Sequence, residues 1–390
     1  MLSCQKHLFF LPEDHHYLNC AYMSPMMEAV EAAGIQGIRR KRNPVGMPSS
    51  SFFEEANRLR KRFAALIGTE EAERVAIVPS VSYGMATVAQ NTPVSPGQTI
   101  VVAHEQFPSN IYAWKRLEAR GATLRVVGPP PTPTDRGAHW NARLLEAIDA
   151  STAAVCLGHV HWADGTRFDL DAIGVRCREV GAALVVDGTQ SIGALPFEMS
   201  TIQPDAVVCA GYKWLMGPYS LGLAYYGPRY DEGLPLEDNW LMRRDSEDFS
   251  KLVAYQDAYQ PGAIRYDVGQ RSNFILVPML IQALDQLLAW TPAAIQAYCD
   301  ALLRPVLEEA TTWGYQVEDP AHRSAHLVGI RAPAHVSMDH LKEALAQHRV
   351  AVSVRGSAIR VSPHVYNEPR NAEALREALH AAAFAAEHSL

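Results

Sequence analysis

The chain has 390 residues, of which 48% are hydrophobic and 20% are charged, with a formal net charge of −7. This composition is typical of a soluble globular protein, and the length predicts two domains, since single cores stop growing below this size. The modest charge, with no stretch dense in Lys or Arg, argues against nucleic acid and anionic membranes as partners, and no apolar run approaches the roughly 20 residues that span a bilayer.

Short apolar runs alternate with helix-like stretches from about residue 50 to residue 230. An amphipathic helix is predicted at 54–67, closed by Gly68, with further helices at 83–90 and 110–120. Seven strands are predicted, at 75–78, 99–103, 123–127, 153–158, 182–186, 206–210 and 222–226. This alternation predicts an α/β fold with a mostly parallel sheet covered on both faces. Ligands of such sheets bind beyond the carboxyl ends of the strands.

The second part of the chain has a different pattern. It is irregular from 230 to about 270, and a long apolar helix follows at about 274–290. The remainder predicts a helix, a strand, a helix, two strands and a last Ala-rich helix from Asn371. We therefore expect a large α/β domain at 15–270 and a smaller α+β domain made of 1–14 and 271–390.

The most informative pair of residues is Asp187 and Lys213. Asp187 ends one strand-like run, and Lys213 follows the next run closely. Two parallel strands would deliver this carboxylate and this amine to the same edge of the sheet. Pyridoxal 5'-phosphate (PLP) needs such a pair, an acid for its pyridine nitrogen and an amine that carries it as a Schiff base. Taken alone, Asp187 is equally typical of a turn or helix cap, and Lys213 of a solvated surface.

Two segments between strands and helices add to this pair. The small residues around Val81 and Ser82 leave backbone N–H groups at a helix N-terminus, which suits a phosphate, although an ordinary Ser N-cap has the same pattern. Phe107 follows the next strand and would stack on a pyridine ring, or would simply be a core residue.

Arg360 lies between Ile359 and Val361 on a predicted strand. Buried arginine is unfavourable unless it is paired. A substrate carboxylate would pair with it in a bidentate way, and a structural salt bridge is the alternative. His159 and His161 share a strand face but have no third ligand at a usual spacing, so we expect no metal.

Together these residues resemble the class V aminotransferase family of PLP enzymes of fold type I, which includes cysteine desulfurases, kynureninase and isopenicillin-epimerase-like proteins. The resemblance extends from Tyr17-Leu18-Asn19 to Tyr366-Asn367. It implies a homodimer with shared active sites. The residue roles that it implies are Lys213 as the Schiff-base lysine, Asp187 at the pyridinium nitrogen, Gln190 near the phenolic oxygen, Val81 and Ser82 at the phosphate, Phe107 as the stacking ring, Arg360 at the substrate α-carboxylate, and Gln270 and Asn273 as phosphate ligands given to one subunit by the other.

Three departures from the family pattern narrow the prediction. Tyr212 precedes the lysine where desulfurases have histidine, and this Tyr-Lys pair is more like kynureninase, whose tyrosine reaches the phosphate. The segment 354–358 lacks the mobile cysteine of desulfurases. Trp162 stands where many relatives place an asparagine near the phenolic oxygen. We therefore expect a family member that is not a true cysteine desulfurase.

The function expected from the resemblance is PLP chemistry at Cα of an amino-acid substrate, with an aminotransferase first. The alternatives are a PLP-dependent β-lyase, such as a C–S lyase or a kynureninase-like hydrolase, and an epimerase. A catalytically silent PLP-binding protein is the alternative outside the enzymes. Six scattered cysteines without a CxxC pair favour a reducing, cytoplasmic location.

Overall fold

The computed structural model describes residues 2–131 and 135–384. Its helices are α1 (Glu28–Arg40), α2 (Glu54–Ile67), α3 (Val81–Asn91), α4 (Tyr112–Lys115), α5 (Arg136–Ala147), α6 (Leu170–Val180), α7 (Met199–Ile202), α8 (Leu276–Trp290), α9 (Pro292–Thr312), α10 (Met338–Gln347) and α11 (Pro369–Phe384). Its strands are β1 (His16–Tyr17), β2 (Val75–Val78), β3 (Thr99–Ala103), β4 (Thr123–Val127), β5 (Thr152–Gly158), β6 (Ala183–Asp187), β7 (Ala206–Ala210), β8 (Gly222–Tyr226), β9 (Gln316–Val317), β10 (Val328–Arg331), β11 (Val350–Ala351), β12 (Ser353–Arg355) and β13 (Ala358–Val361).

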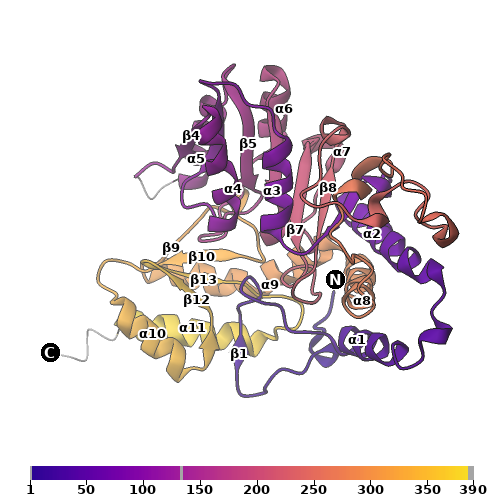
Figure 1. The fold of residues 1–390 in the computed structure, drawn as a ribbon. Coiled ribbons are helices and arrows are strands. Elements are labelled where there is room, and N and C mark those ends of the chain that lie inside the picture. Colours follow the sequence, from indigo (N-terminus) through magenta and orange to yellow (C-terminus); the bar gives the residue numbers. More distant parts are fainter. Residues whose placement is uncertain (1, 132–134, 385–390) are drawn as a thin grey trace.

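A seven-stranded sheet forms the centre of the larger part of the molecule (Figure 1). The strand order is β2-β8-β7-β6-β5-β3-β4, and β8 alone runs against its neighbours. The pairs between β7, β6, β5, β3 and β4 are all parallel. Their carboxyl ends therefore open at one common edge, where a parallel α/β sheet binds its ligands.

Helices cover both faces of this sheet, and the strands accordingly are buried on both sides. Alternate side chains of each strand enter two different clusters, as the period of two in a strand requires. One cluster packs the sheet against α3 and α4. The other packs it against α2, α5, α6 and α8. The near-continuous Val, Ile, Leu and Ala of these strands reflect this double burial.

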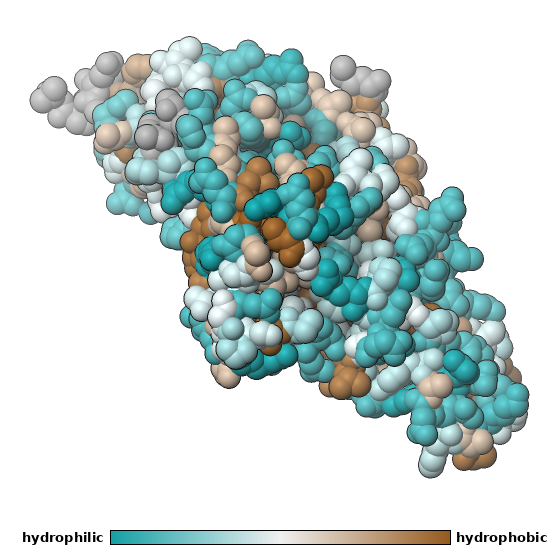
Figure 2. Space-filling view, turned by 90° about the horizontal axis from the view of Figure 1, so that it is seen from above, coloured by the Kyte–Doolittle hydropathy of each residue, from teal (hydrophilic) through white to brown (hydrophobic). Residues whose placement is uncertain are grey.

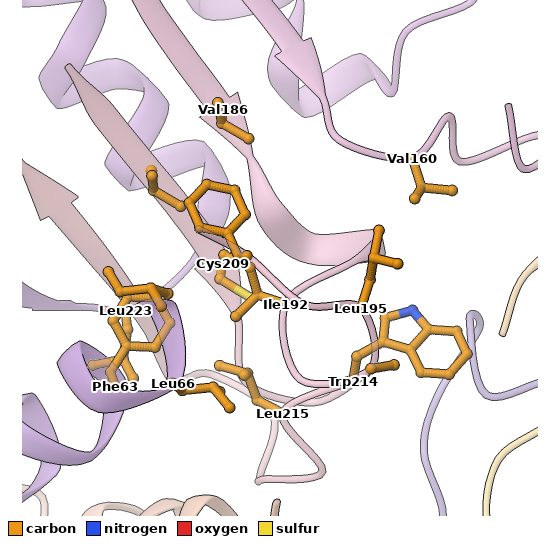
Figure 3. Packing of buried hydrophobic residues seen from close by; sticks show 14 of the residues in the cluster. Phe63, Leu66, Val160, Val186, Ile192, Leu195, Cys209, Trp214, Leu215 and Leu223 are labelled. Atoms are coloured by element: carbon orange, nitrogen blue, oxygen red, sulfur yellow. The ribbon is translucent and has the colours of Figure 1, made fainter. Parts of the chain in front are cut away.

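The cluster on the α2 side also anchors the segment that follows β7. Trp214 and Leu215 are fully buried in it. Figure 3 shows them beside Leu195 and Ile192, with Phe63 and Leu66 of α2 close by. The backbone immediately after Lys213 is thus fixed by the packing of buried apolar side chains.

A second, smaller sheet is built from the C-terminal part of the chain. It has the antiparallel order β12-β13-β10-β9 and lies below the large sheet in Figure 1, with α10 and α11 beneath it. A separate apolar cluster joins this sheet to α9, α10 and α11. Leu18, near the N-terminus, belongs to the same cluster, while α8 packs with the large sheet. The domain limits near residues 15 and 270 stay a prediction.

The surface seen from above is mainly hydrophilic, with one compact hydrophobic group near its centre (Figure 2). Among the described helices, none combines the length and the apolar character that a membrane crossing requires.

The predicted α/β class and the mostly parallel sheet are confirmed, and all seven predicted strands are present within one residue at each end. The single helix predicted at 110–120 is wrong. The structure has the short helix α4 between two 3-10 helices, Pro108–Asn110 and Arg116–Arg120. Tight turns such as Ile111 N to Pro108 O (2.9 Å) break the helical ladder there.

Gly84 lets α3 approach the sheet closely, and its replacement tests this packing. A Cβ at this position would stand 2.6 Å from Cγ1 of Val208 on β7. We expect Gly84→Ala to lower the free energy of unfolding by about 1–3 kcal/mol, as overpacking does, in urea titrations followed by circular dichroism. Adding Val208→Ala should restore part of this loss, and Gly46→Ala, with no atom within 4 Å of its new Cβ, is the matched control. An unchanged midpoint for Gly84→Ala would contradict this account.

Candidate active site

A cavity of about 330 Å³ opens at the carboxyl edge of the large sheet. Its volume lies in the range of small-molecule sites, roughly 300–1,000 Å³. Eight of the sequence-predicted site residues line it, and the lining residues that the argument uses are Ser80, Val81, Ser82, Phe107, Trp162, Asp187, Thr189, Gln190, Tyr212, Lys213 and Tyr219.

Asp187 ends β6 with its carboxylate at this edge. Oδ1 accepts the backbone N–H of Thr189 at 3.0 Å, so the residue does cap a short turn. Oδ2 is 3.4 Å from Nδ2 of Asn110, which leaves room for a further donor. Burial raises the pKa of Asp187, against the opposing effects of the Thr189 hydrogen bonds, the Lys213 charge and Asn110. A buried carboxylate in this setting favours a cationic N–H partner.

Lys213 lies on a tight loop between β7 and β8. Gly211 donates to the carbonyl of Leu221 at 2.8 Å, and a Cβ on Gly211 would stand 2.5 Å from that same oxygen. The loop therefore depends on glycine at this position, two residues before the lysine. On its other side, Trp214 is buried and donates through Nε1 to Oε1 of Gln190 at 2.8 Å.

The amine of Lys213 is largely buried and lies 5.5 Å from the ring centres of both Phe107 and Tyr212. Burial and the positive charge of Arg360 lower the pKa of Lys213 to about 8. Asp187 opposes this effect through its charge, while its two carboxylate oxygens accept hydrogen bonds from Thr189 and Asn110. About a tenth of Lys213 is therefore unprotonated, and nucleophilic, at pH 7, far more than for a free lysine.

The N-terminus of α3 faces the same cavity. Ser80, and not Ser82, is the N-cap, and its Oγ accepts the N–H of Tyr83 at 3.2 Å. The hydroxyls of Ser80 and Ser82 lie 2.9 Å apart. The first N–H groups of a helix lack intrahelical acceptors, and those of Val81 and Ser82 have no acceptor in the described part of the chain. Two hydroxyls and two free N–H groups at a helix start suit a phosphate.

Phe107 and Trp162 form an aromatic wall of the cavity. Their rings meet edge to face at 5.3 Å, and Phe107 is 38% exposed. The alternative that Phe107 is a core residue is therefore wrong. Trp162 is fixed by a 2.6 Å hydrogen bond from Nε1 to the carbonyl of Glu105, a residue with φ of +53°.

Gln190 and Tyr212 complete the walls beside the lysine. Nε2 of Gln190 donates to the carbonyl of Ala21 at 3.2 Å, and its Oε1 is taken by Trp214, so one amide N–H remains for a ligand. Tyr212 packs against Tyr219 at 4.6 Å between ring centres, and burial raises its pKa. Tyr212 thus stays a neutral hydroxyl at ordinary pH.

Arg360 is 1% exposed on β13 and contacts Trp162 from behind the cavity wall. Nη1 donates to the carbonyl of Trp162 at 2.6 Å, and Nη2 to Oγ of Ser353 at 3.3 Å. Nε has no partner among the described residues, and no described carboxylate pairs with the guanidinium. The alternative of a structural salt bridge is therefore wrong for this residue. Burial and then the charge of Arg355 lower the pKa of Arg360 to about 10.

Three predicted residues do not line the cavity: Arg360, which lies behind the Trp162 wall, and Gln270 and Asn273, which lie away from it. The latter two are exposed, and Gln270 has a φ of +60°. Asn273 accepts the N–H of Ile275 and of Leu276 at 3.1 and 2.9 Å, which starts α8. Their service to a second subunit stays a prediction.

Sequence reasoning missed Asn110 and Arg355. Asn110 touches Asp187 and accepts Nε1 of Trp114 at 3.0 Å. Asn110 lies three residues after Phe107, and this spacing could have indicated that it belongs to the site. Arg355 lies over the ring of Trp162, 5.2 Å from its centre. A second arginine five residues before Arg360 on a hairpin would have pointed to it.

The chain belongs to the aminotransferase class V family, whose model matches residues 39–380. A relative named probable cysteine desulfurase, from Methanothermobacter thermautotrophicus, is 29% identical over 219 residues, which cover 55% of this chain and 54% of the relative. The chain thus spans about half the length of this relative. An uncharacterized aminotransferase of Bacillus subtilis, YcbU, is 26% identical over 363 residues and 93% of each chain.

Solved structures share the fold at low identity. C-DES, in a form with glycine covalently linked to its PLP cofactor, superimposes with a TM-score of 0.80 over 97% of this chain and 99% of that chain, at 19% identity. The predicted PLP fold type I and the predicted cofactor of the family are confirmed by these matches.

The lowered pKa of Lys213 predicts an unusual titration. In the protein without PLP, amine labelling at Lys213 should be half-maximal near pH 8 and should grow as pH rises through that value, against about 10.4 for a free lysine. Labelling is read by mass spectrometry of the peptide that contains residue 213. Exposed Lys61 provides the internal control for the reactivity of the reagent at each pH.

Two substitutions should move this titration in opposite directions. Arg360→Leu removes a neighbouring positive charge and should raise the midpoint, whereas Asp187→Asn removes a negative charge and should lower it. Equal midpoints in all three proteins would show that the two charges do not act on Lys213.

Proposed function

We propose that the protein is a PLP-dependent enzyme that acts at Cα of an α-amino acid, as an aminotransferase. The observation that carries this proposal is the placement of Lys213 and Asp187 in one cavity, with Arg360 directly behind its Trp162 wall. The amine has a lowered pKa, the carboxylate is buried, and the guanidinium is buried without a carboxylate partner among the described residues. Family membership supports the same chemistry.

The residues of the cavity fit PLP part by part. Lys213 would hold it covalently, Asp187 would accept the ring N–H, and the N–H groups of Val81 and Ser82 would take the phosphate. Phe107 offers a flat wall for the ring, and the free amide N–H of Gln190 suits an oxygen. When bound, PLP supplies the electron sink that weakens the bonds at Cα.

The chain itself supplies orientation and proton transfer. Arg360 holds the α-carboxylate through its fork of donors, and this contact fixes the direction of the Cα–H bond. Lys213, with a pKa of about 8, is suited to remove that proton near neutral pH. Trp214 follows Lys213 in the chain and is fully buried, so it restricts the movement of the backbone at the lysine.

Transamination is the first candidate because the chain belongs to the aminotransferase class V family and its relative YcbU is named an aminotransferase. Loss of a β-substituent would need an acid beside the leaving group. A β-lyase remains the second candidate, with Tyr212 as its acid, because this neutral hydroxyl lies beside Lys213.

A homodimer in the cytoplasm completes the proposal. Gln270 and Asn273 are exposed away from the cavity of their own chain. This position suits a contribution to the phosphate site of a second subunit.

The cofactor assignment is tested first. With PLP, the protein should gain a visible absorbance band, and borohydride should fix the cofactor on the peptide containing Lys213. Lys213→Ala should lose this label, while Lys61→Ala should keep it. A protein that takes up no PLP would sink the proposal.

The reaction is tested by its products. Amino acids are given to the PLP-loaded enzyme in stoichiometric amounts, without a keto-acid acceptor. Transamination releases a keto acid and leaves the amino group on the enzyme, so no ammonia appears. Ammonia together with pyruvate would establish the β-lyase instead, and a D-amino acid would establish an epimerase. Arg360→Leu should reduce the rate at low substrate concentration by at least about tenfold, since a charged hydrogen bond is lost.

A further inference from the structure

A second arginine shares the strand face that carries Arg360. In the β12–β13 hairpin, Ser353 pairs with Arg360 and Arg355 pairs with Ala358. Opposite residues of an antiparallel pair point to the same face, and so do residues two apart on one strand. Arg355 and Arg360 are therefore diagonal neighbours, about 7 Å apart at Cβ. Gly356, with a φ of +59°, permits the two-residue turn between the strands.

No acidic side chain in the described part of the chain pairs with the guanidinium of Arg355. It lies over the ring of Trp162, and Nη1 donates to the neighbouring carbonyl of Val354 at 2.7 Å. Nε is buried and lacks an acceptor within the described residues. Other arginines of the chain do pair with carboxylates. Arg331, in the same small sheet as Arg355, pairs with Asp164, whereas Arg355 forms no such pair with a described residue.

Depth distinguishes the two arginines. Arg360 is almost fully buried, whereas Arg355 is half-buried and directly precedes the exposed turn at Gly356 and Ser357. Arg360 is thus the more deeply buried of the two guanidiniums, and Arg355 is the more accessible to a ligand. Trp162 contacts both arginines. Its carbonyl accepts a hydrogen bond from Arg360, and the guanidinium of Arg355 lies over its ring.

We propose that Arg355 is a specificity-determining residue that selects α-amino acids whose side chain ends in a carboxylate. This inference rests on the proposed function, in which Arg360 takes the α-carboxylate. The second carboxylate then meets Arg355, whose Nε and Nη2 have no acceptor among the described residues, while Nη1 donates to Val354. Amino-dicarboxylates are the substrate class that two separated guanidiniums match.

The neighbouring charges support this assignment. Without an anion, two cations face the lysine, and both Arg360 and Arg355 lower the pKa of Lys213. A neutral side chain would leave the charge of Arg355 unmatched beside the aromatic wall. A carboxylate would neutralise it in a partly desolvated place, where charge-assisted hydrogen bonds are strong.

The inference is tested with isosteric ligand pairs on the PLP-loaded protein. Binding of L-glutamate and L-glutamine, and of glutarate as a dicarboxylate without an amine, is measured by calorimetry. We expect glutamate to bind at least about tenfold more tightly than glutamine, and Arg355→Gln to remove this preference. Arg355→Lys should keep part of it, while Arg116→Gln, an exposed arginine elsewhere, should leave it unchanged.

Two results would overturn the inference. One is equal binding of glutamate and glutamine by the unaltered protein. The other is an Arg355→Gln variant that weakens both ligands by the same factor, since this would mean that Arg355 only supports Trp162. Failure of the proposed function has a separate signature, the absence of covalent PLP at Lys213, and glutarate binding that depends on Arg355 can be measured in that case as well.

Discussion

The parallel pairing of β5, β6 and β7 determines where chemistry can take place in this chain. Their register sets Gly158 beside Asp187 and Asp187 beside Val208, so that β5 and β6 end together while β7 continues to Ala210. Inside the sheet, the backbone N–H and C=O groups are hydrogen-bonded between strands. The first free polar groups therefore lie at this edge. A carboxylate placed there is surrounded by apolar strands on both faces, which explains the raised pKa of Asp187.

One short N-terminal segment connects this edge to the arginine hairpin. Leu18 accepts the N–H of Ser362, next to Arg360, at 2.8 Å. Three residues later, Ala21 accepts the side chain of Gln190 at 3.2 Å, and Ser24 donates to the carbonyl of Tyr212 at 3.2 Å. The distance between the amine of Lys213 and the guanidinium of Arg360 therefore depends on residues that belong to neither of their strands.

The sheet and the Asp187–Lys213 pair were predictable because they depend on local sequence. Apolar runs define the strands, and Asp187 at the end of one run and Lys213 shortly after the next mark the functional edge. The partners of these residues were not predictable in the same way. Asn110 reaches Asp187 from 77 residues away, and Arg355 acquires its meaning only because the hairpin register places it on the face of Arg360. Long-range contacts of this kind leave no periodic signal, and the broken helix around α4 shows that a local pattern also fails where turns compete with it.

The charge of the cavity runs against that of the whole chain. The protein carries a net charge of −7, yet Lys213 and the N-terminus of α3 line a cavity in which Asp187 is the acidic lining residue. Two further cations, Arg360 and Arg355, contact the Trp162 wall of this cavity. A cationic recess in an anionic surface concentrates the field at one place and draws small anions there more than elsewhere. The phosphate of PLP and the carboxylates of a substrate all carry the sign that this field attracts. None of these cations forms an ion pair with a carboxylate of the described chain. Folding therefore leaves several of their hydrogen-bond donors unpaired, and the bound anions would pair with these donors.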